Sequence, residues 1–236
     1  MKLRTLCTSL VLASVLSAPA FAEYSKSDIE KIVHDYIVNN PDVLIEASDN
    51  VKRRQMEIQK QKQDKMIAEI ISNKQFPQSG PAKAKHTVIE FFDYNCGYCK
   101  KAKPLFIDLL KENSDTRYIY MEFPILSEIS NTAAKIGVAI YNLDKAKYVK
   151  YNNELMTRNS RLSNEVELQA LVESLDLNWK EVKQLSESKD VEEVLADIRY
   201  AASELDVSGT PAFVIDGEVL RGAPRSKNDI KRLLKN

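Results

Sequence analysis

The spacing of apolar residues along this 236-residue chain changes several times, and the first change falls before residue 80. Apolar side chains recur at helical spacing over residues 28–51, at Ile29, Ile32, Val33, Tyr36 and Ile37, then at Val43, Leu44, Ala47 and Val51. Residues 52–65 are mostly polar. Residues 77–85, Pro-Gln-Ser-Gly-Pro-Ala-Lys-Ala-Lys, have the composition of a linker. We therefore expect an N-terminal helical segment over 23–76 and a linker over 77–85.

The remaining residues, 86–236, alternate between strand-like and helix-like patterns. An apolar run at 87–92 predicts a buried strand, followed by a helix to about residue 111 and a second strand at 117–123. A long helical block covers about 128–206. Residues 211–220 predict a β-hairpin with an Asp216-Gly217 turn, and a last helix follows at 226–235. This order, β-α-β, helical insertion, β-β-α, predicts an α/β chain with a thioredoxin fold.

The first 22 residues have the pattern of a secretory signal peptide. Lys2 and Arg4 precede an apolar stretch over 10–16, and Ala20-Phe21-Ala22 resembles a cleavage site. The apolar stretch is shorter than the roughly 20 residues that a spanning helix needs. Cys7 lies inside this leader, so the mature chain would keep only Cys96 and Cys99. We expect an exported protein, located in the periplasm.

Composition narrows the classes of partner. The chain has 34 basic and 34 acidic residues, so its formal charge gives no reason to expect nucleic acid or an anionic membrane surface as partner. In an exported protein structural disulfides are common and free thiols are rare. A single close pair of cysteines cannot staple a fold of this size, which indicates that the pair serves chemistry.

That pair is Cys96-Gly97-Tyr98-Cys99, placed where the predicted strand meets a helix. The free N–H groups and the dipole at a helix N-terminus stabilise a thiolate, which is the form that attacks disulfides. A zinc site is the competing interpretation. Zinc takes about four ligands, and His34 and His86 lack the necessary spacing. The sequence favours redox chemistry by the two thiols, with no metal and no bound cofactor.

Two segments more than a hundred residues apart resemble the DsbA-like thiol-disulfide oxidoreductases. They are residues 88–99, Val-Ile-Glu-Phe-Phe-Asp-Tyr-Asn-Cys-Gly-Tyr-Cys, and residues 208–214, Ser-Gly-Thr-Pro-Ala-Phe-Val. The segment 32–47 is similar to that of a subgroup that includes the ScsC and Com-type proteins. The resemblance spans the mature chain and implies a DsbA-like thioredoxin domain at 86–236, preceded by a helical stalk.

The resemblance also implies roles for individual residues. Cys96 matches the nucleophile of the family and Cys99 the buried resolving thiol. Glu90, six residues before Cys96, matches an acidic residue buried beneath the cysteines and would accept the proton of Cys99. The alternative is that Glu90 faces solvent at a strand edge.

Four further residues are expected to contact substrate. Pro211 matches the cis-proline opposite the active site, and the backbone of Thr210 would offer hydrogen bonds to a substrate strand. Gly97 and Tyr98, between the cysteines, would contact unfolded substrate. The resemblance is the sole basis for the cis isomer, because few X–Pro bonds are cis.

Gly97-Tyr98 between the cysteines and Thr210 before the proline are similar to the corresponding residues of the disulfide isomerase DsbC. Strongly oxidising DsbA enzymes have Pro-His between the cysteines and valine before the cis-proline. We therefore expect an isomerase or reductase acting on unfolded or wrongly disulfide-bonded exported proteins and served by a DsbD-like membrane redox partner. A DsbA-like oxidase with a DsbB-like partner, or a bifunctional enzyme, is the main alternative. A holdase chaperone or a copper-binding protein is a remote one.

The N-terminal segment also bears on the choice between an isomerase and an oxidase. Leu44, Val51 and Ile58 are seven apart, but Lys65 breaks the series, so the pattern is a poor coiled coil. One interpretation of this segment is a solvated helical extension that packs loosely on its own domain. We favour self-association through residues 28–51 into a dimer or trimer, because several sites facing one substrate gain effective concentration.

Overall fold

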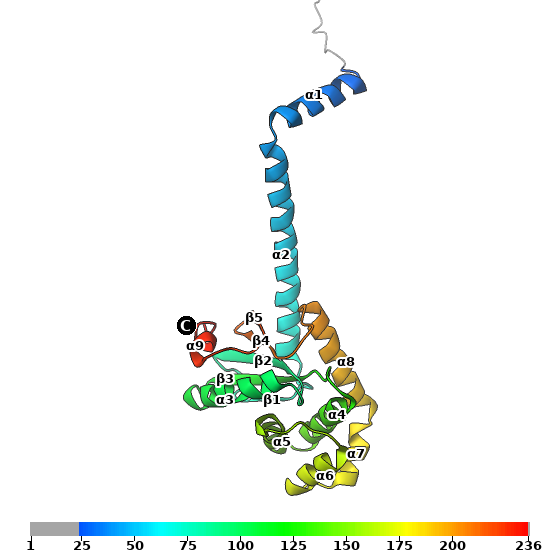
Figure 1. Ribbon diagram of the computed structural model, residues 1–236, viewed down its shortest axis with the longest axis vertical. Helices are drawn as coiled ribbons and strands as arrows, with labels where there is room; N and C mark the ends of the chain where they lie inside the picture. The colour runs from blue at the N-terminus through cyan, green and yellow to red at the C-terminus, as the bar shows by residue number, and fades with distance from the viewer. Residues whose placement is uncertain (1–23, 236) are drawn as a thin grey trace, which may run out of the picture. The chain divides into compact units, whose positions relative to one another are not determined.

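The computed structural model describes residues 24–235 (Figure 1). The signal peptide expected at 1–22 lies outside these residues. The chain divides into two compact units, one ending at Gln55 and one beginning at Met56. Among the described helices, none is both long enough and apolar enough to span a bilayer.

The first unit is helical. Helix α1, Lys26–Asn39, starts with a capping box in which the Ser25 and Asp28 side chains each accept the other's backbone N–H. Helix α2 follows over Asp42–Ser72. The apolar positions of α1 that share one face are 50–58% exposed: Ile29, Ile32, Val33 and Tyr36. Residues 24–55, the described part of this unit, contain no buried side chain and therefore have no apolar core of their own.

The second unit contains a five-stranded sheet in the order β1-β3-β2-β4-β5. The strands are β1 Gln78–Ser79, β2 His86–Phe92, β3 Thr116–Glu122, β4 Ala212–Ile215 and β5 Glu218–Arg221. Strands β2 and β3 are parallel, and the other pairs are antiparallel. From residue 88 to residue 92 the central strand β2 is buried, and it is apolar there except at Glu90, because both of its faces are covered.

Seven helices complete this unit. Helix α3, Gly97–Glu112, connects β2 to β3. Five helices then occupy the expected insertion, and Figure 1 shows α4 to α7 grouped together beside the sheet: α4 Glu128–Leu143, α5 Lys145–Thr157, α6 Glu165–Ser174, α7 Trp179–Ser186 and α8 Lys189–Glu204. Helix α9, Lys227–Lys231, follows the hairpin and contacts α3. The predicted α/β class and thioredoxin fold with a helical insertion are confirmed.

Two segments lie differently from the expectation. Part of the expected linker, Gln78–Ser79, is strand β1 and pairs with β3. The last turns of α2 belong to the second unit, because Met66, Ile67 and Ile70 are buried in its core. Their i, i+1, i+4 spacing gives the helix one apolar side that the sheet can cover.

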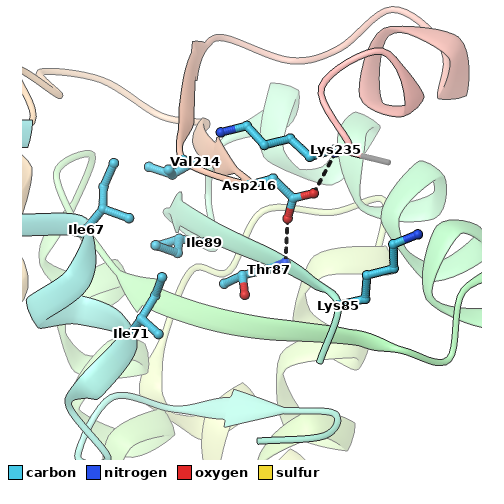
Figure 2. Close-up of a pocket in the computed structure, with 9 residues that line it drawn as sticks. Ile67, Ile71, Lys85, Thr87, Ile89, Val214, Asp216 and Lys235 are labelled. Carbon is cyan, nitrogen blue, oxygen red and sulfur yellow. Dashed lines mark hydrogen bonds between the residues drawn. The ribbon is translucent and has the colours of Figure 1, made fainter. Parts of the chain in front are cut away.

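The predicted hairpin turn has a second structural role. Asp216 and Gly217 both have positive φ, 47° and 90°, as a tight β-hairpin turn requires. The Asp216 carboxylate accepts backbone hydrogen bonds from Thr87 and Lys235, at 2.8 and 2.9 Å (Figure 2). It also lies 2.7 Å from Nδ1 of His86. Asp216 thus ties the start of β2 to the C-terminal residues, at the end of β2 remote from the cysteines.

Candidate active site

Cys96 is the N-cap residue of α3, where the chain leaves β2. Its Sγ accepts a hydrogen bond of 3.3 Å from the backbone N–H of Cys99. The pKa of Cys96 is lowered to about 5, first by a hydrogen bond from the Cys99 side chain and then by bonds from Thr210 and the helix backbone, against the opposing effect of burial. Cys96 is therefore a thiolate at neutral pH, in the position that the sequence predicted.

The loop that carries Cys96 is held by Asp93, whose buried carboxylate has four donors. Oδ1 accepts from the backbone N–H of Asn95 and from Ser130, both at 2.7 Å. Oδ2 accepts from the backbone N–H groups of Ile125 and Leu126, both at 2.9 Å. A carboxylate bonded in this way fixes the turn between strand and helix. Apart from the polarity of Asp93 after an apolar strand, no sequence signal pointed to this role.

Cys99 and Glu90 lie in the interior below Cys96. Cys99 is fully buried, and burial is the main reason that its pKa is raised far above the usual range. Glu90 is also fully buried, which excludes the solvent-facing alternative. Burial raises the pKa of Glu90, and the positive charge of Lys103 and a 2.5 Å hydrogen bond from Tyr118 oppose that rise. The Glu90 charge acts on Cys99, so the two groups are electrostatically coupled.

Lys103 lies at the site although the sequence favoured a solvated position for it, because lysines just after a helix start usually face water. Its side chain is buried, and Nζ donates a hydrogen bond of 2.6 Å to Oδ1 of Asn152. Nζ also lies 5.4 and 5.0 Å from the ring centroids of Tyr118 and Tyr120. Burial lowers the pKa of Lys103, and the charges of Glu90 and Glu122 oppose this. The available signal was its position four residues after buried Cys99, on the inner face of α3.

Glu122, at the end of β3, is a third buried carboxyl near the site, after Asp93 and Glu90. Its Oε1 accepts hydrogen bonds from the hydroxyls of Tyr94 and Tyr148, at 2.6 and 2.9 Å. Burial raises the pKa of Glu122 to about 8, against these two bonds. Helix α4 passes this carboxyl at Gly137, where an added Cβ would lie 2.8 Å from Oε1.

The residues predicted to contact substrate meet at the same place. The Thr210–Pro211 peptide bond is cis, and Sγ of Cys96 lies 3.4 Å from the carbonyl oxygen of Thr210. Gly97 and Tyr98 are exposed beside Cys96. The fold therefore brings together both distant motifs, 96–99 and 210–211. Among residues 24–235, no group of three His, Cys, Asp or Glu side chains is arranged to hold a metal ion.

A dithiol at the N-terminus of α3, facing a cis-proline loop, defines a thioredoxin-like protein. The comparison with protein families agrees: residues 87–233 match the DSBA-like thioredoxin domain, and the chain belongs to this family. Residues 26–57 match the N-terminal domain of the copper resistance protein ScsC.

Solved structures with the same fold cover most of the chain. The thiol-disulfide exchange protein alpha-DsbA2 of Wolbachia pipientis is 25% identical with a TM-score of 0.68, over 76% of this chain and 96% of that one. BcfH of Salmonella enterica Typhimurium is 29% identical with a TM-score of 0.61, over 88% and 93%. A linker-deleted ScsC of Proteus mirabilis, 22% identical with a TM-score of 0.66 over 91% and 97%, shares the fold.

Curated relatives include longer proteins. The Na(+)/H(+) antiporter NhaA 3 of Salinispora tropica is 26% identical over 139 residues, which are 58% of this chain and 21% of the antiporter. The chain thus spans about a fifth of that relative.

Proposed function

We propose that the protein is a periplasmic thiol-disulfide isomerase or reductase that acts on exported proteins through Cys96 and Cys99. The observation that carries the dithiol chemistry is the contrast between the two thiols, and the likeness of Gly97-Tyr98 and Thr210 to the corresponding residues of the disulfide isomerase DsbC favours an isomerase or reductase over an oxidase. Cys96 has a pKa of about 5, whereas burial holds Cys99 protonated. One sulfur is therefore ready to attack, and the other reacts only after its proton is taken.

The reaction follows from this contrast. The Cys96 thiolate attacks one sulfur of a substrate disulfide, a mixed disulfide forms, and the other substrate sulfur leaves as a thiolate. In isomerisation a substrate thiolate attacks the mixed disulfide and releases Cys96 unchanged. In reduction Cys99 loses its proton to Glu90 and attacks the Cys96 sulfur instead, so that a Cys96–Cys99 disulfide forms and the remaining substrate sulfur leaves as a thiolate. A DsbD-like membrane partner would then supply the two electrons that restore both thiols.

Cellular location and assembly are part of the proposal. The leader pattern at 1–22 supports export to the periplasm. The exposed apolar face of α1 supports self-association into a dimer or trimer, because side chains of this size gain free energy when they leave water. The helices before residue 56 would then serve as the stalk that joins several catalytic domains.

A DsbA-like oxidase is the second candidate, and the low pKa of Cys96 favours it. A stabilised thiolate stabilises the reduced protein, which makes the disulfide form a stronger oxidant. In this role the Cys96–Cys99 disulfide accepts two electrons from a substrate dithiol, and a DsbB-like partner reoxidises the enzyme.

Trapping the thiols in cells separates the two roles. Cells are quenched with acid, free thiols are alkylated with a reagent that adds mass, and the protein is resolved by electrophoresis. We expect Cys96 and Cys99 to be mostly reduced. A mostly oxidised pair would support the oxidase. If the wild-type protein does not exchange disulfides and Cys96→Ser prevents aggregation of an unfolded substrate as well as the wild type does, both roles are overturned in favour of a holdase. Stoichiometric Cu(I) binding would favour the copper-binding alternative.

A further inference from the structure

A groove of about 580 Å³ opens beside the nucleophile. Its apolar part is formed by Tyr98, Ile125 and Leu126, which are 66%, 44% and 52% exposed. Asn95, Cys96, Gly97, Gly209 and Thr210 line the rest, together with two cations, Lys101 and Arg161. Large apolar side chains exposed together next to a reactive group mark a surface that binds another chain.

The two cations in the groove have no acidic partner in the described part of the chain. Lys101 Nζ lies 5.4 Å from the ring centroid of Tyr98, on the groove side of α3. Arg161 is exposed and forms no ion pair with residues 24–235, whereas the nearby Arg158 pairs with Glu167. The groove therefore presents positive charge beside Cys96 that the domain itself leaves uncompensated.

Hydrogen bonds on both sides of Arg161 fix its segment to the start of α3. Asn95 exchanges two hydrogen bonds with the backbone of Leu162, at 3.0 and 2.8 Å, and the Leu162 side chain is buried. Lys100 Nζ donates to the carbonyls of Arg158 and Ser160, at 3.3 and 2.8 Å. Arg161 lies between these anchors, so its place at the groove does not depend on a free loop.

We propose that this groove binds an extended segment of a substrate protein in which an apolar residue and an acidic residue flank the reacting cysteine. The inference rests on the proposed function and adds a preference among its substrates. The apolar residue would pack on Tyr98, Ile125 and Leu126. The acidic residue would face Lys101 and Arg161, which attract a carboxylate and repel a basic side chain.

Mixed disulfides of short peptides test this preference. Three peptides differ only in the residue beside a single cysteine, Glu, Gln or Lys, and each cysteine carries the same aromatic thiol. In the Cys99→Ser variant, Cys96 attacks the peptide sulfur, a Cys96–peptide disulfide forms, and the coloured aromatic thiolate leaves. We expect the Glu peptide to react about threefold faster than the Gln peptide at low salt and the Lys peptide about threefold slower, with the differences shrinking at high salt.

Matched variants assign the preference to the groove. Lys101→Gln with Arg161→Gln, in the same Cys99→Ser background, should make the three rates equal. Lys111→Gln with Lys180→Gln removes the same charge from exposed positions outside the groove and should keep the preference. A small neutral thiol in place of the protein corrects for intrinsic peptide reactivity.

The possible failures are distinguishable. If all three peptides react at one rate, or if the preference survives Lys101→Gln with Arg161→Gln, the inference is wrong and the proposed function is untouched. If Cys96 reacts with none of the peptides faster than an unfolded cysteine does, the proposed function itself fails.

Discussion

The hydroxyl of Tyr118 donates a hydrogen bond of 2.5 Å to Oε2 of Glu90, directly below the dithiol. The other carboxyl oxygen, Oε1, is buried and has no hydrogen-bond partner among residues 24–235. A buried polar atom without a partner is costly, and such atoms recur at functional sites. One oxygen of Glu90 is thus held by Tyr118 while the other stays available for a proton.

We predict that Glu90→Gln slows the attack of Cys99 on the mixed disulfide by about tenfold or more, because the amide cannot accept the Cys99 proton. The rate is measured by single-turnover release of a peptide bound to Cys96. Tyr118→Phe keeps the carboxyl and should have a smaller effect. Release by Glu90→Gln at the wild-type rate would show that Cys99 loses its proton elsewhere.

Lys103→Met tests how the buried cation acts on this carboxyl. The charge of Lys103 opposes the rise in the pKa of Glu90, so its removal should raise that pKa further. More Glu90 is then protonated at neutral pH, and the pH profile of peptide release should move upward by about one unit. Lys111→Met, on the exposed end of the same helix, is the control. A profile that stays in place would contradict the electrostatic role of Lys103.

The elements were predictable where a sequence pattern recorded burial directly. The apolar run before Cys96 gave β2, the Asp216-Gly217 pair gave the hairpin, and helical spacing gave the insertion. Strand β1 was missed because it has only two residues, and its pairing with β3 depends on the tertiary fold rather than on a run of its own.

Only part of the candidate site could be predicted from the sequence. Cys96 and Cys99 followed from their spacing and from the strand-to-helix context. Glu90 could be proposed from the family resemblance, supported by its place as the one carboxyl in an apolar strand. Lys103 and Glu122 could not, since a lysine in a polar helix and a glutamate at a strand end are usually solvated, and only the packing of α4 and α5 buries them.

Thr210→Val is expected to raise the pKa of Cys96 by about one unit, since valine keeps the shape of threonine but cannot donate a hydrogen bond to the thiolate. Thiolate absorbance as a function of pH gives the midpoint, which should be about 5 in the wild-type protein. The folded pKa is depressed, so the thiolate stabilises the reduced protein most above about pH 8.5, and this stabilisation is lost as the pH falls through the folded pKa. An unchanged midpoint in Thr210→Val would exclude the hydroxyl as a donor.

A truncated protein that tests the role of the N-terminal helices should keep Met56 and all residues after it. Removing residues up to 76 would take Met66, Ile67 and Ile70 out of the core, at about 1.5–3 kcal/mol for each buried side chain. A chain that begins at Met56 should stay folded, lose self-association and isomerise scrambled substrate more slowly, while the reaction of Cys96 with a small disulfide is unchanged. Sedimentation and refolding assays measure these properties.

A point variant separates loss of assembly from loss of chain length. Ile32→Glu puts a charge on the apolar face of α1 and should weaken self-association, whereas Lys31→Glu on the same helix should not. If Ile32→Glu assembles like the wild-type protein, this face is not the interface.

Gly137→Ala offers a test in which two effects have opposite signs. Inside a helix, alanine is normally more stable than glycine by about 1 kcal/mol. At this position, however, the new Cβ would lie 2.8 Å from Oε1 of Glu122 and 3.3 Å from the hydroxyl of Tyr94. We expect net destabilisation of about 1–3 kcal/mol, measured by urea unfolding. In Glu122→Ala the carboxyl is absent, so the added methyl group should cost less, and the two changes should be non-additive. Equal costs in both backgrounds would mean that α4 does not pack against the Glu122 carboxyl.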